Sequence, residues 1–173
     1  MSNDALGRLA PHFFQVAYVI RDLEAAEKWF QRIMGVPFFT RSEIVLGEGC
    51  TYRGKPADSA MRLSLGFAGE VQIELIEALR GQSIYTEFME AKGPGLHHVA
   101  FSVPDVDATV AELCAAGLVP IQEGSFGDGR VKFSYFDCDA EGASVIEILG
   151  FDAATTAAME QMKQAAKAAA QAS

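Results

Sequence analysis

Several residue types are scarce in this chain of 173 residues, and each shortage argues against a class of function. The three cysteines, Cys50, Cys114 and Cys138, lack the spacing of a metal site, and an odd number without a signal peptide fits a reducing cytoplasm. The 14 basic against 23 acidic side chains give a net charge of −9, which disfavours binding to nucleic acid or to an anionic membrane surface. No apolar run approaches the roughly 20 residues that cross a bilayer. We therefore expect a cytoplasmic protein with no nucleic-acid or membrane partner.

Apolar residues are abundant at 50% of the chain, enough for one large core or for two half-size modules that share one. Residues 14–22 lie over residues 97–105 without a gap, and this match pairs Gln15 with His98. Each copy has the pattern of a strand followed by an aspartate that caps a helix. The repeat indicates an internal duplication.

The predicted elements follow the same order in both copies, namely a strand, a helix and three more strands. In the first copy we expect a strand at 13–20, a helix at 23–34, and strands at 36–46, 61–67 and 71–78. In the second we expect a strand at 96–103, a helix at 106–116, and strands at 118–123, 130–137 and 144–149. Turn-forming residues predict a mobile surface loop at 47–60. The chain thus divides into an N-terminal arm (1–12), a first βαβββ module (13–79), a connector (80–95), a second module (96–150) and an Ala-rich helical tail (151–173).

Two glutamates stand at equivalent places in the two copies. Glu74 and Glu147 each lie in the middle of an apolar last strand. A carboxylate there is costly to bury unless it is paired, protonated or bound to a cation. If the modules pair about a pseudo-twofold axis, these acids can converge with Gln15 and His98. One imidazole, two carboxylates and an amide oxygen suit Zn, Ni, Co, Mn or Fe rather than a metal that prefers thiolates.

Simpler interpretations stay open for each of these residues. The glutamates could line a solvated sheet face, His98 could be a core residue, and Gln15 could only form hydrogen bonds. Strand alternation sends His97 to the opposite face from His98, so His97, like His12, is expected to be structural or on the surface. Surface positions are also expected for Glu77 and for the basic residues that could attract an anionic substrate tail, Arg53, Lys55 and Arg130.

The pattern resembles the vicinal oxygen chelate (VOC) superfamily, which includes glyoxalase I, methylmalonyl-CoA epimerase, extradiol dioxygenases, and the fosfomycin and bleomycin resistance proteins. The resemblance covers about residues 13–150. It is carried by residues 15–22, by Ile-Glu-Leu at 73–75, by Gly-Leu-His-His-Val-Ala-Phe at 95–101 and by Val-Ile-Glu-Ile at 145–148.

The resemblance implies an α+β fold in which two βαβββ modules form a cupped mixed sheet around a metal, here followed by the Ala-rich C-terminal helix. The four ligand places of the family fall on Gln15, Glu74, His98 and Glu147. In glyoxalase I enzymes with a similar ligand set, a divalent metal stabilises an enediolate from a substrate with neighbouring oxygens. Glu147 and Glu74 are then the expected catalytic residues, moving a proton as general base and acid.

The expected function is therefore a metal-dependent isomerase or lyase of the glyoxalase I or methylmalonyl-CoA epimerase type. We expect a small-molecule substrate and a homodimer, with the modules paired within one chain or swapped between two. The second catalytic glutamate of the epimerases falls near Asp58 and Ser59, where this chain has no glutamate.

Two alternatives follow from the same resemblance. The first is a metal-free ligand-binding protein of the bleomycin-resistance type. The second is an extradiol-type dioxygenase, which is disfavoured because Gln15 replaces a histidine of its iron site, so that another histidine such as His12 would have to reach the iron.

Overall fold

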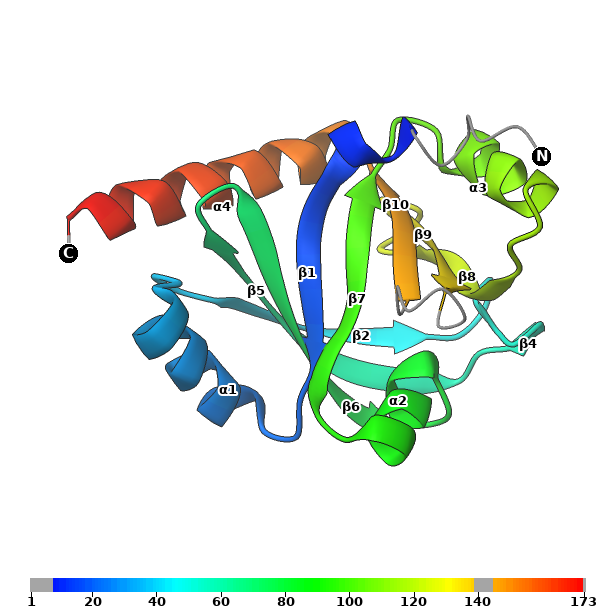
Figure 1. The fold of residues 1–173 in the computed structure, drawn as a ribbon, viewed down its shortest axis with the longest axis horizontal. Helices are drawn as coiled ribbons and strands as arrows, with labels where there is room; N and C mark the ends of the chain where they lie inside the picture. The colour runs from blue at the N-terminus through cyan, green and yellow to red at the C-terminus, as the bar shows by residue number, and fades with distance from the viewer. Residues whose placement is uncertain (1–7, 139–144, 173) are drawn as a thin grey trace.

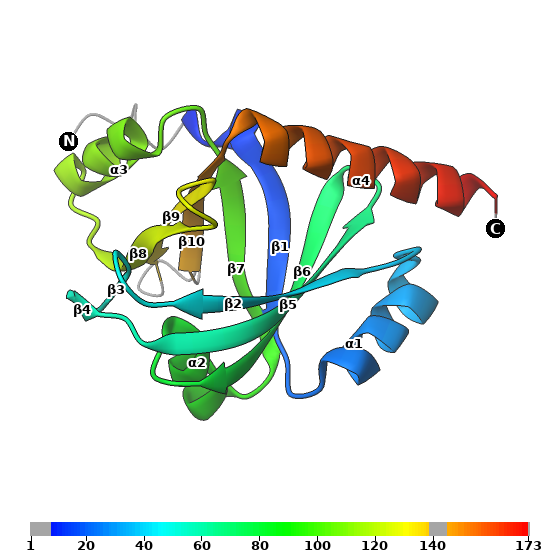
Figure 2. The ribbon, with the colours of Figure 1, turned by 180° about the vertical axis from the view of Figure 1, so that it is seen from behind.

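The computed structural model describes residues 8–138 and 145–172 of the chain. A single mixed sheet of ten strands curls into a cup, with helices around it (Figures 1 and 2). The strands that form it are β1 (Phe13–Val19), β2 (Thr40–Leu46), β3 (Thr51–Tyr52), β4 (Lys55–Pro56), β5 (Ser59–Ala68), β6 (Val71–Arg80), β7 (Gly95–Ser102), β8 (Pro120–Phe126), β9 (Val131–Asp137) and β10 (Val145–Phe151). The helices are α1 (Leu23–Trp29), α2 (Ile84–Lys92), α3 (Val106–Ala115) and α4 (Ala153–Gln171).

The sheet order is β2-β5-β6-β1-β7-β10-β9-β8-β3-β4. The predicted α+β class with two βαβββ units in a cupped sheet is therefore confirmed, and the units join through the antiparallel pair β1 and β7. Within each unit the first strand pairs in parallel with the last, β1 with β6 and β7 with β10. The two central strands thus belong to different copies of the repeat, and their last strands flank them on either side.

Aspartate caps begin three of the helices, as the sequence predicts. Asp22, Asp105 and Asp152 each accept a hydrogen bond from a backbone N–H three residues on, which satisfies a donor left free by the first helical turn. α1 passes into a π-helical turn, Phe30–Met34, and ends at Gly35 in the left-handed conformation (φ 69°), which glycine adopts without a Cβ clash.

Among the elements that differ from their predicted extents, three differ most. β2 begins at Thr40 rather than at residue 36, because Pro37 has no N–H to donate to a ladder. The segment 47–60 is not simply a loop: it contains β3 and β4 and the start of β5, and β3 pairs with β8 of the other half. α2 is a full helix with a capping box between Ser83 and Thr86, within the segment 80–95 that the sequence predicts only as a connector.

The C-terminal helix packs on the body of the protein. α4 runs along one end of the sheet, past the β5–β6 hairpin (Figures 1 and 2). Ala166 is buried, and Lys163 and Lys167 form ion pairs with Glu70 in the hairpin turn. In the described part of the chain, no helix combines the length and the hydropathy needed to cross a membrane.

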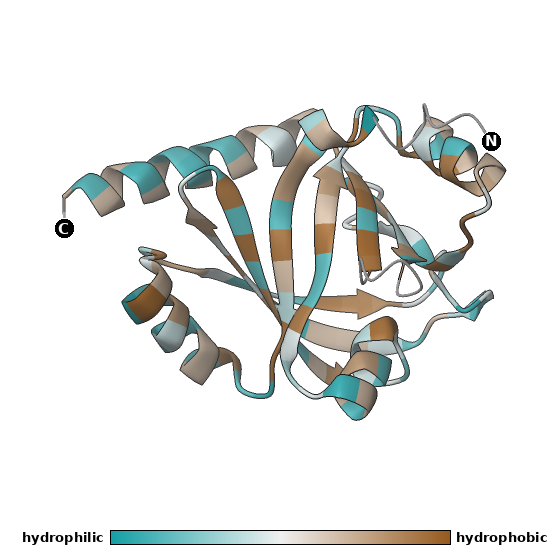
Figure 3. Cartoon of the chain, in the orientation of Figure 1, coloured by the Kyte–Doolittle hydropathy of each residue, from teal (hydrophilic) through white to brown (hydrophobic). Residues whose placement is uncertain are grey.

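The core divides between the inside of the cup and the helix-covered outer faces. One cluster of apolar residues lies around β1, β5, β7 and β9, and two smaller ones lie under α1 and α3. Hydrophilic bands interrupt the hydrophobic central strands (Figure 3).

Candidate metal centre

Strand register brings the four predicted ligand residues to the middle of the cup. In one row across the sheet, Ala17 of β1 lies between Glu74 of β6 and His98 of β7. Neighbouring residues in a row share a face of the sheet, so Glu74 and His98 lie on the same side with only an alanine methyl between them.

The next row repeats this arrangement with the two halves exchanged. Here Ala100 of β7 lies between Gln15 of β1 and Glu147 of β10. Ala17 and Ala100 are fully buried, and their small side chains leave room above the sheet for the larger polar groups on either side. The rows therefore give the pseudo-twofold arrangement that the repeat predicts.

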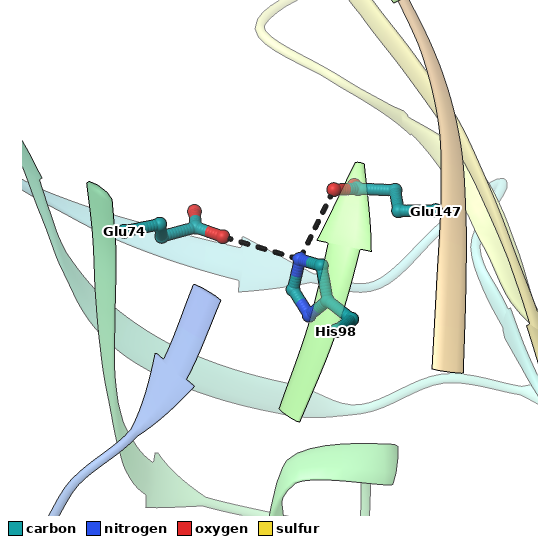
Figure 4. A group of neighbouring side chains, drawn as sticks. All are labelled: Glu74, His98 and Glu147. Atoms are coloured by element: carbon teal, nitrogen blue, oxygen red, sulfur yellow. Dashed lines mark ion pairs between the residues drawn. The ribbon is translucent and has the colours of Figure 1, made fainter. Parts of the chain in front are cut away.

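Three of these side chains meet closely. His98 Nε2 lies 3.2 Å from Glu147 Oε2 and 3.5 Å from Glu74 Oε2, and the two acids reach this one nitrogen from different strands (Figure 4). Their exposed fractions are 1% for His98, 6% for Glu147 and 7% for Glu74. Among the described His, Cys, Asp and Glu residues, these three form the one group whose ligand atoms all lie within 4.8 Å of one another.

Burial and charge shift the titration of this group. Burial raises the pKa of Glu74, and the charge of Glu147 adds to that effect while His98 opposes it. Burial alone would discharge His98, but the two glutamates outweigh it and raise the pKa of the imidazole to about 9. Without a cation, the cluster is therefore stabilised by a proton on the histidine.

A second histidine orients the first. His97 Nδ1 lies 2.8 Å from His98 Nδ1, and the His97 ring packs between Tyr85 and Phe88 of α2. Burial lowers the pKa of His97 to about 3, so its ring is neutral. When His98 donates its Nδ1 hydrogen to His97, its Nε2 is left between the two acids to hold either a proton or a metal ion.

Gln15 is oriented by a different partner. Its Nε2 donates to Gln72 Oε1 at 2.8 Å, and Gln72 in turn lies 3.3 Å from Met159 Sδ of α4. The buried Oε1 of Gln15 has no hydrogen-bond partner within the described residues. The amide oxygen is therefore the unused atom of this side chain.

The donor atoms fit a divalent cation. His98 Nε2 also lacks a well-aligned hydrogen bond among the described residues, although two carboxylates lie beside it. Buried polar atoms without partners are rare in folded proteins, and they often mark the place where an ion binds. One nitrogen with carboxylate and amide oxygens suits Zn, Ni, Co, Mn or Fe.

A cavity of about 230 Å³ opens beside the cluster. Gln15, Glu74 and Glu147 contribute to its polar end. Tyr85 and Tyr135 also line it, and the Tyr85 hydroxyl donates to that of Tyr135 at 2.8 Å. Burial raises the pKa of both phenols, so they stay protonated.

The other sequence candidates lie outside this group. His12 is the last residue of a short 3₁₀ turn before β1 and is not in the cluster. Asp58 is exposed and forms an ion pair with Arg80. Glu77 is mostly buried rather than on the surface, because its carboxylate pairs with Arg62 at 2.8 Å. Arg53, expected to be free in a surface loop, is paired with Glu87 at 2.7 Å.

Sequence reasoning missed the residues that support the ligand side chains. The parity rule places His97 and His98 on opposite faces, but it does not show that α2 covers His97 or that the two rings meet. Gln72 gave no signal, because its relation to Gln15 is a cross-strand pairing between residues far apart in the chain.

A family comparison agrees with the geometry. The family model described as the Glyoxalase/Bleomycin resistance protein/Dioxygenase superfamily matches residues 14–135. The chain belongs to this superfamily, as the sequence motifs predict.

Solved structures of similar fold include methylmalonyl-CoA epimerases. The enzyme from Mycobacterium tuberculosis superposes with a TM-score of 0.64 at 20% identity, over 86% of this chain and 93% of its own. The E43L variant of the Streptomyces coelicolor enzyme, in complex with 2-nitronate-propionyl-CoA, gives a TM-score of 0.63 at 18% identity, over 82% of this chain and 95% of its own. At these identities the likeness concerns the fold.

A curated relative is the uncharacterized protein YqjC of Bacillus subtilis, which is 26% identical over 86 residues. The match covers 50% of this chain and 53% of that protein, so the chain spans about half the length of the curated relative it matches.

Proposed function

We propose that this protein is a metal-dependent isomerase or lyase of the glyoxalase I or methylmalonyl-CoA epimerase type, which moves a proton at a carbon beside a carbonyl. The observation that carries the proposal is the buried Glu74–His98–Glu147 group, in which two acids face one imidazole nitrogen at the end of a cavity. Gln15, Glu74, His98 and Glu147 are the proposed ligands. A divalent cation, when bound, polarises substrate oxygens and stabilises the negative charge that develops on them.

The chain's own groups would handle the proton. Glu147 lines the cavity and is the proposed base that removes a proton from the substrate carbon. Glu74 also lines the cavity and faces the same His98 nitrogen (Figure 4), and it is the proposed acid that returns a proton. Two acids from different strands allow one carboxylate to remove a proton and the other to return one.

The cavity also protects the reaction from water. Its walls are mainly apolar, and exclusion of water strengthens the electrostatic interactions of the acids. The buried phenols of Tyr85 and Tyr135 offer hydroxyl groups that stay protonated beside the acids. Among the described residues that line the cavity, these are the only tyrosines.

Metal binding and proton exchange test the proposal together. The purified chain is loaded with Zn, Ni, Co or Mn, and the metal content is measured. Deuterium uptake from D₂O is then followed by NMR with three substrates: methylmalonyl-CoA, the methylglyoxal–glutathione hemithioacetal and 2-hydroxyacetophenone. We expect one metal per chain and uptake into at least one substrate.

His98→Gln is the matched variant, since it gives the second half the residue that the first half has at Gln15. It should lose most metal affinity, because an amide is a poorer ligand than imidazole for these metals. Failure of the unmodified chain to bind any of the four metals would overturn the proposal.

A metal-free binding protein is the second candidate, favoured by the apolar cavity beside the cluster. It predicts that Glu147→Gln leaves ligand affinity unchanged. The proposed enzyme instead needs Glu147 both for metal binding and for proton transfer.

A further inference from the structure

The walls of the cavity contrast with its polar end. Leu63 and Leu65 of β5 line one side, and Phe133, Leu149 and Phe151 of β9 and β10 line another. None of the described residues that line the cavity is lysine or arginine. The cavity therefore offers apolar contacts and carboxylates, but no basic group for an anion.

The surroundings of the cavity also disfavour an anionic ligand. A shallow depression shares Ile44, Phe126, Val131 and Thr155 with the cavity, and its charged residues are Arg130 and Glu43. One cation beside one anion does not match a polyphosphate tail, and the chain as a whole carries a net charge of −9.

Helix α4 forms part of the wall. Met159 and Thr155 line the cavity, and Met159 Sδ accepts a hydrogen bond from Gln72. Methionine is flexible and polarisable, which suits contact with apolar groups of varied shape. The ion pairs of Lys163 and Lys167 with Glu70 hold the helix in this position.

The lining of the cavity limits the class of the ligand. Among the described residues that line it, Glu74 and Glu147 are the only charged ones, and most of the others are apolar. We propose that the cavity takes an uncharged and mainly apolar compound, whose two neighbouring oxygens reach the Glu74–His98–Glu147 group, rather than an acyl-CoA. This inference rests on the proposed function and narrows its substrate class.

Hydroxamates separate the two parts of the proposal. Benzohydroxamate and acetohydroxamate present the same pair of neighbouring oxygens, but only the first has an apolar body. Calorimetric titration of the metal-loaded chain should give at least tenfold tighter binding for benzohydroxamate. Malonate and methylmalonyl-CoA should each bind more weakly than benzohydroxamate. Equal affinity for the two hydroxamates, or tighter binding of methylmalonyl-CoA, would overturn the inference.

A charge-insertion variant tests the wall directly. Leu65 is the cross-strand neighbour of Glu74, so Leu65→Lys places a cation in the cavity beside the acids. It should weaken benzohydroxamate binding at least tenfold and strengthen malonate binding. Leu79→Lys is the control, because Leu79 is 42% exposed and lies outside the cavity. This variant should change neither the benzohydroxamate nor the malonate affinity. If Leu65→Lys does not fold, the ratio of the two hydroxamate affinities of the unmodified chain still tests the apolar preference.

The metal-free chain distinguishes failure of this inference from failure of the proposed function. If metal loading changes neither hydroxamate affinity, the proposed function is wrong, and the ratio between the two hydroxamates remains the test of the apolar preference. If both hydroxamates need the metal but bind equally, the function stands and the substrate class is wrong.

Discussion

The two halves of the sheet share a backbone plan and differ in what surrounds the same positions. In the first half, Gln15 is held by Gln72, and Leu65 lies beside Glu74. In the second, His98 is held by His97, and Tyr135 lies beside Glu147. The first half therefore supplies an amide and one carboxylate, whereas the second supplies an imidazole and the other carboxylate. The repeated backbone places the side chains at equivalent positions, and the residue types at those positions differ between the halves.

The largest expected effect comes from removing the acids one at a time. Glu147→Gln should reduce substrate deuterium exchange by about 10²- to 10⁴-fold, the typical contribution of a general base. Glu74→Gln tests whether the acid of the first half contributes equally to the rate of deuterium exchange. Glu77→Gln on the same strand is the control, since Glu77 pairs with Arg62 and does not line the cavity. An unchanged exchange rate in Glu147→Gln would remove it as the base.

The side chains that orient the ligands should matter less and unequally. His97→Phe should lower metal affinity by roughly 10- to 100-fold, the typical cost of losing an outer hydrogen-bond partner of a ligand. Gln72→Leu should cost less, because it supports an amide rather than an imidazole. Competition with a chromophoric chelator measures both. His97→Asn, which can still accept a hydrogen bond from His98, should recover part of the loss, and a purely structural role would give no such recovery.

The histidine pair predicts a stability maximum for the metal-free chain. The pKa of His98 is about 9 in the folded state against 6.5 for the free side chain, so its contribution is complete below pH 6.5 and is lost as the pH rises to about 9. The raised pKa of Glu74 acts in the same direction. The pKa of His97 is about 3 when folded, so acidification below pH 6.5 also destabilises the fold.

Thermal unfolding from pH 5 to pH 9 should therefore show the highest Tm near pH 6.5, with changes of a few degrees. His98→Gln should flatten the alkaline side and leave the acid side in place. A Tm that rises steadily from pH 6.5 to pH 9 would contradict the assigned proton on His98.

The smallest expected effect concerns a feature that the two halves share, the aspartate cap of the helix after the first strand. Asp22 and Asp105 cap equivalent helices with bonds of 2.9 and 3.0 Å. Replacing either by alanine should lower the free energy of unfolding by about 1 kcal/mol. Urea unfolding measures both variants. A clear difference between them would show that the repeat does not extend to the energetics of its helices.

Much of the fold follows from the sequence because the repeat can be recognised without knowledge of long-range contacts. Residues 14–22 and 97–105 give the two central strands, and alternation places Gln15 and His98 on equivalent faces. The repeated context of Glu74 and Glu147 then leads to the group that the structure brings together.

What the sequence did not predict depends on contacts between distant segments. The strand β3 forms by pairing with β8, about 70 residues further along the chain. The meeting of His97 and His98 needs α2 to cover one face of β7, and the packing of α4 needs the β5–β6 turn to lie beneath it. Local pattern carries no information on such neighbours. The module boundaries, the homodimer and the cytoplasmic location stay predictions.

The ladder between β1 and β7 lies within a single polypeptide. An assembly of two identical subunits must carry every substitution twice, once on each side of its axis. A single chain that contains both copies of the repeat can carry a substitution in one copy only. This freedom allows one side of the cup to present an amide where the other presents an imidazole, so an asymmetric reagent can be bound in a defined orientation inside a nearly symmetric shell.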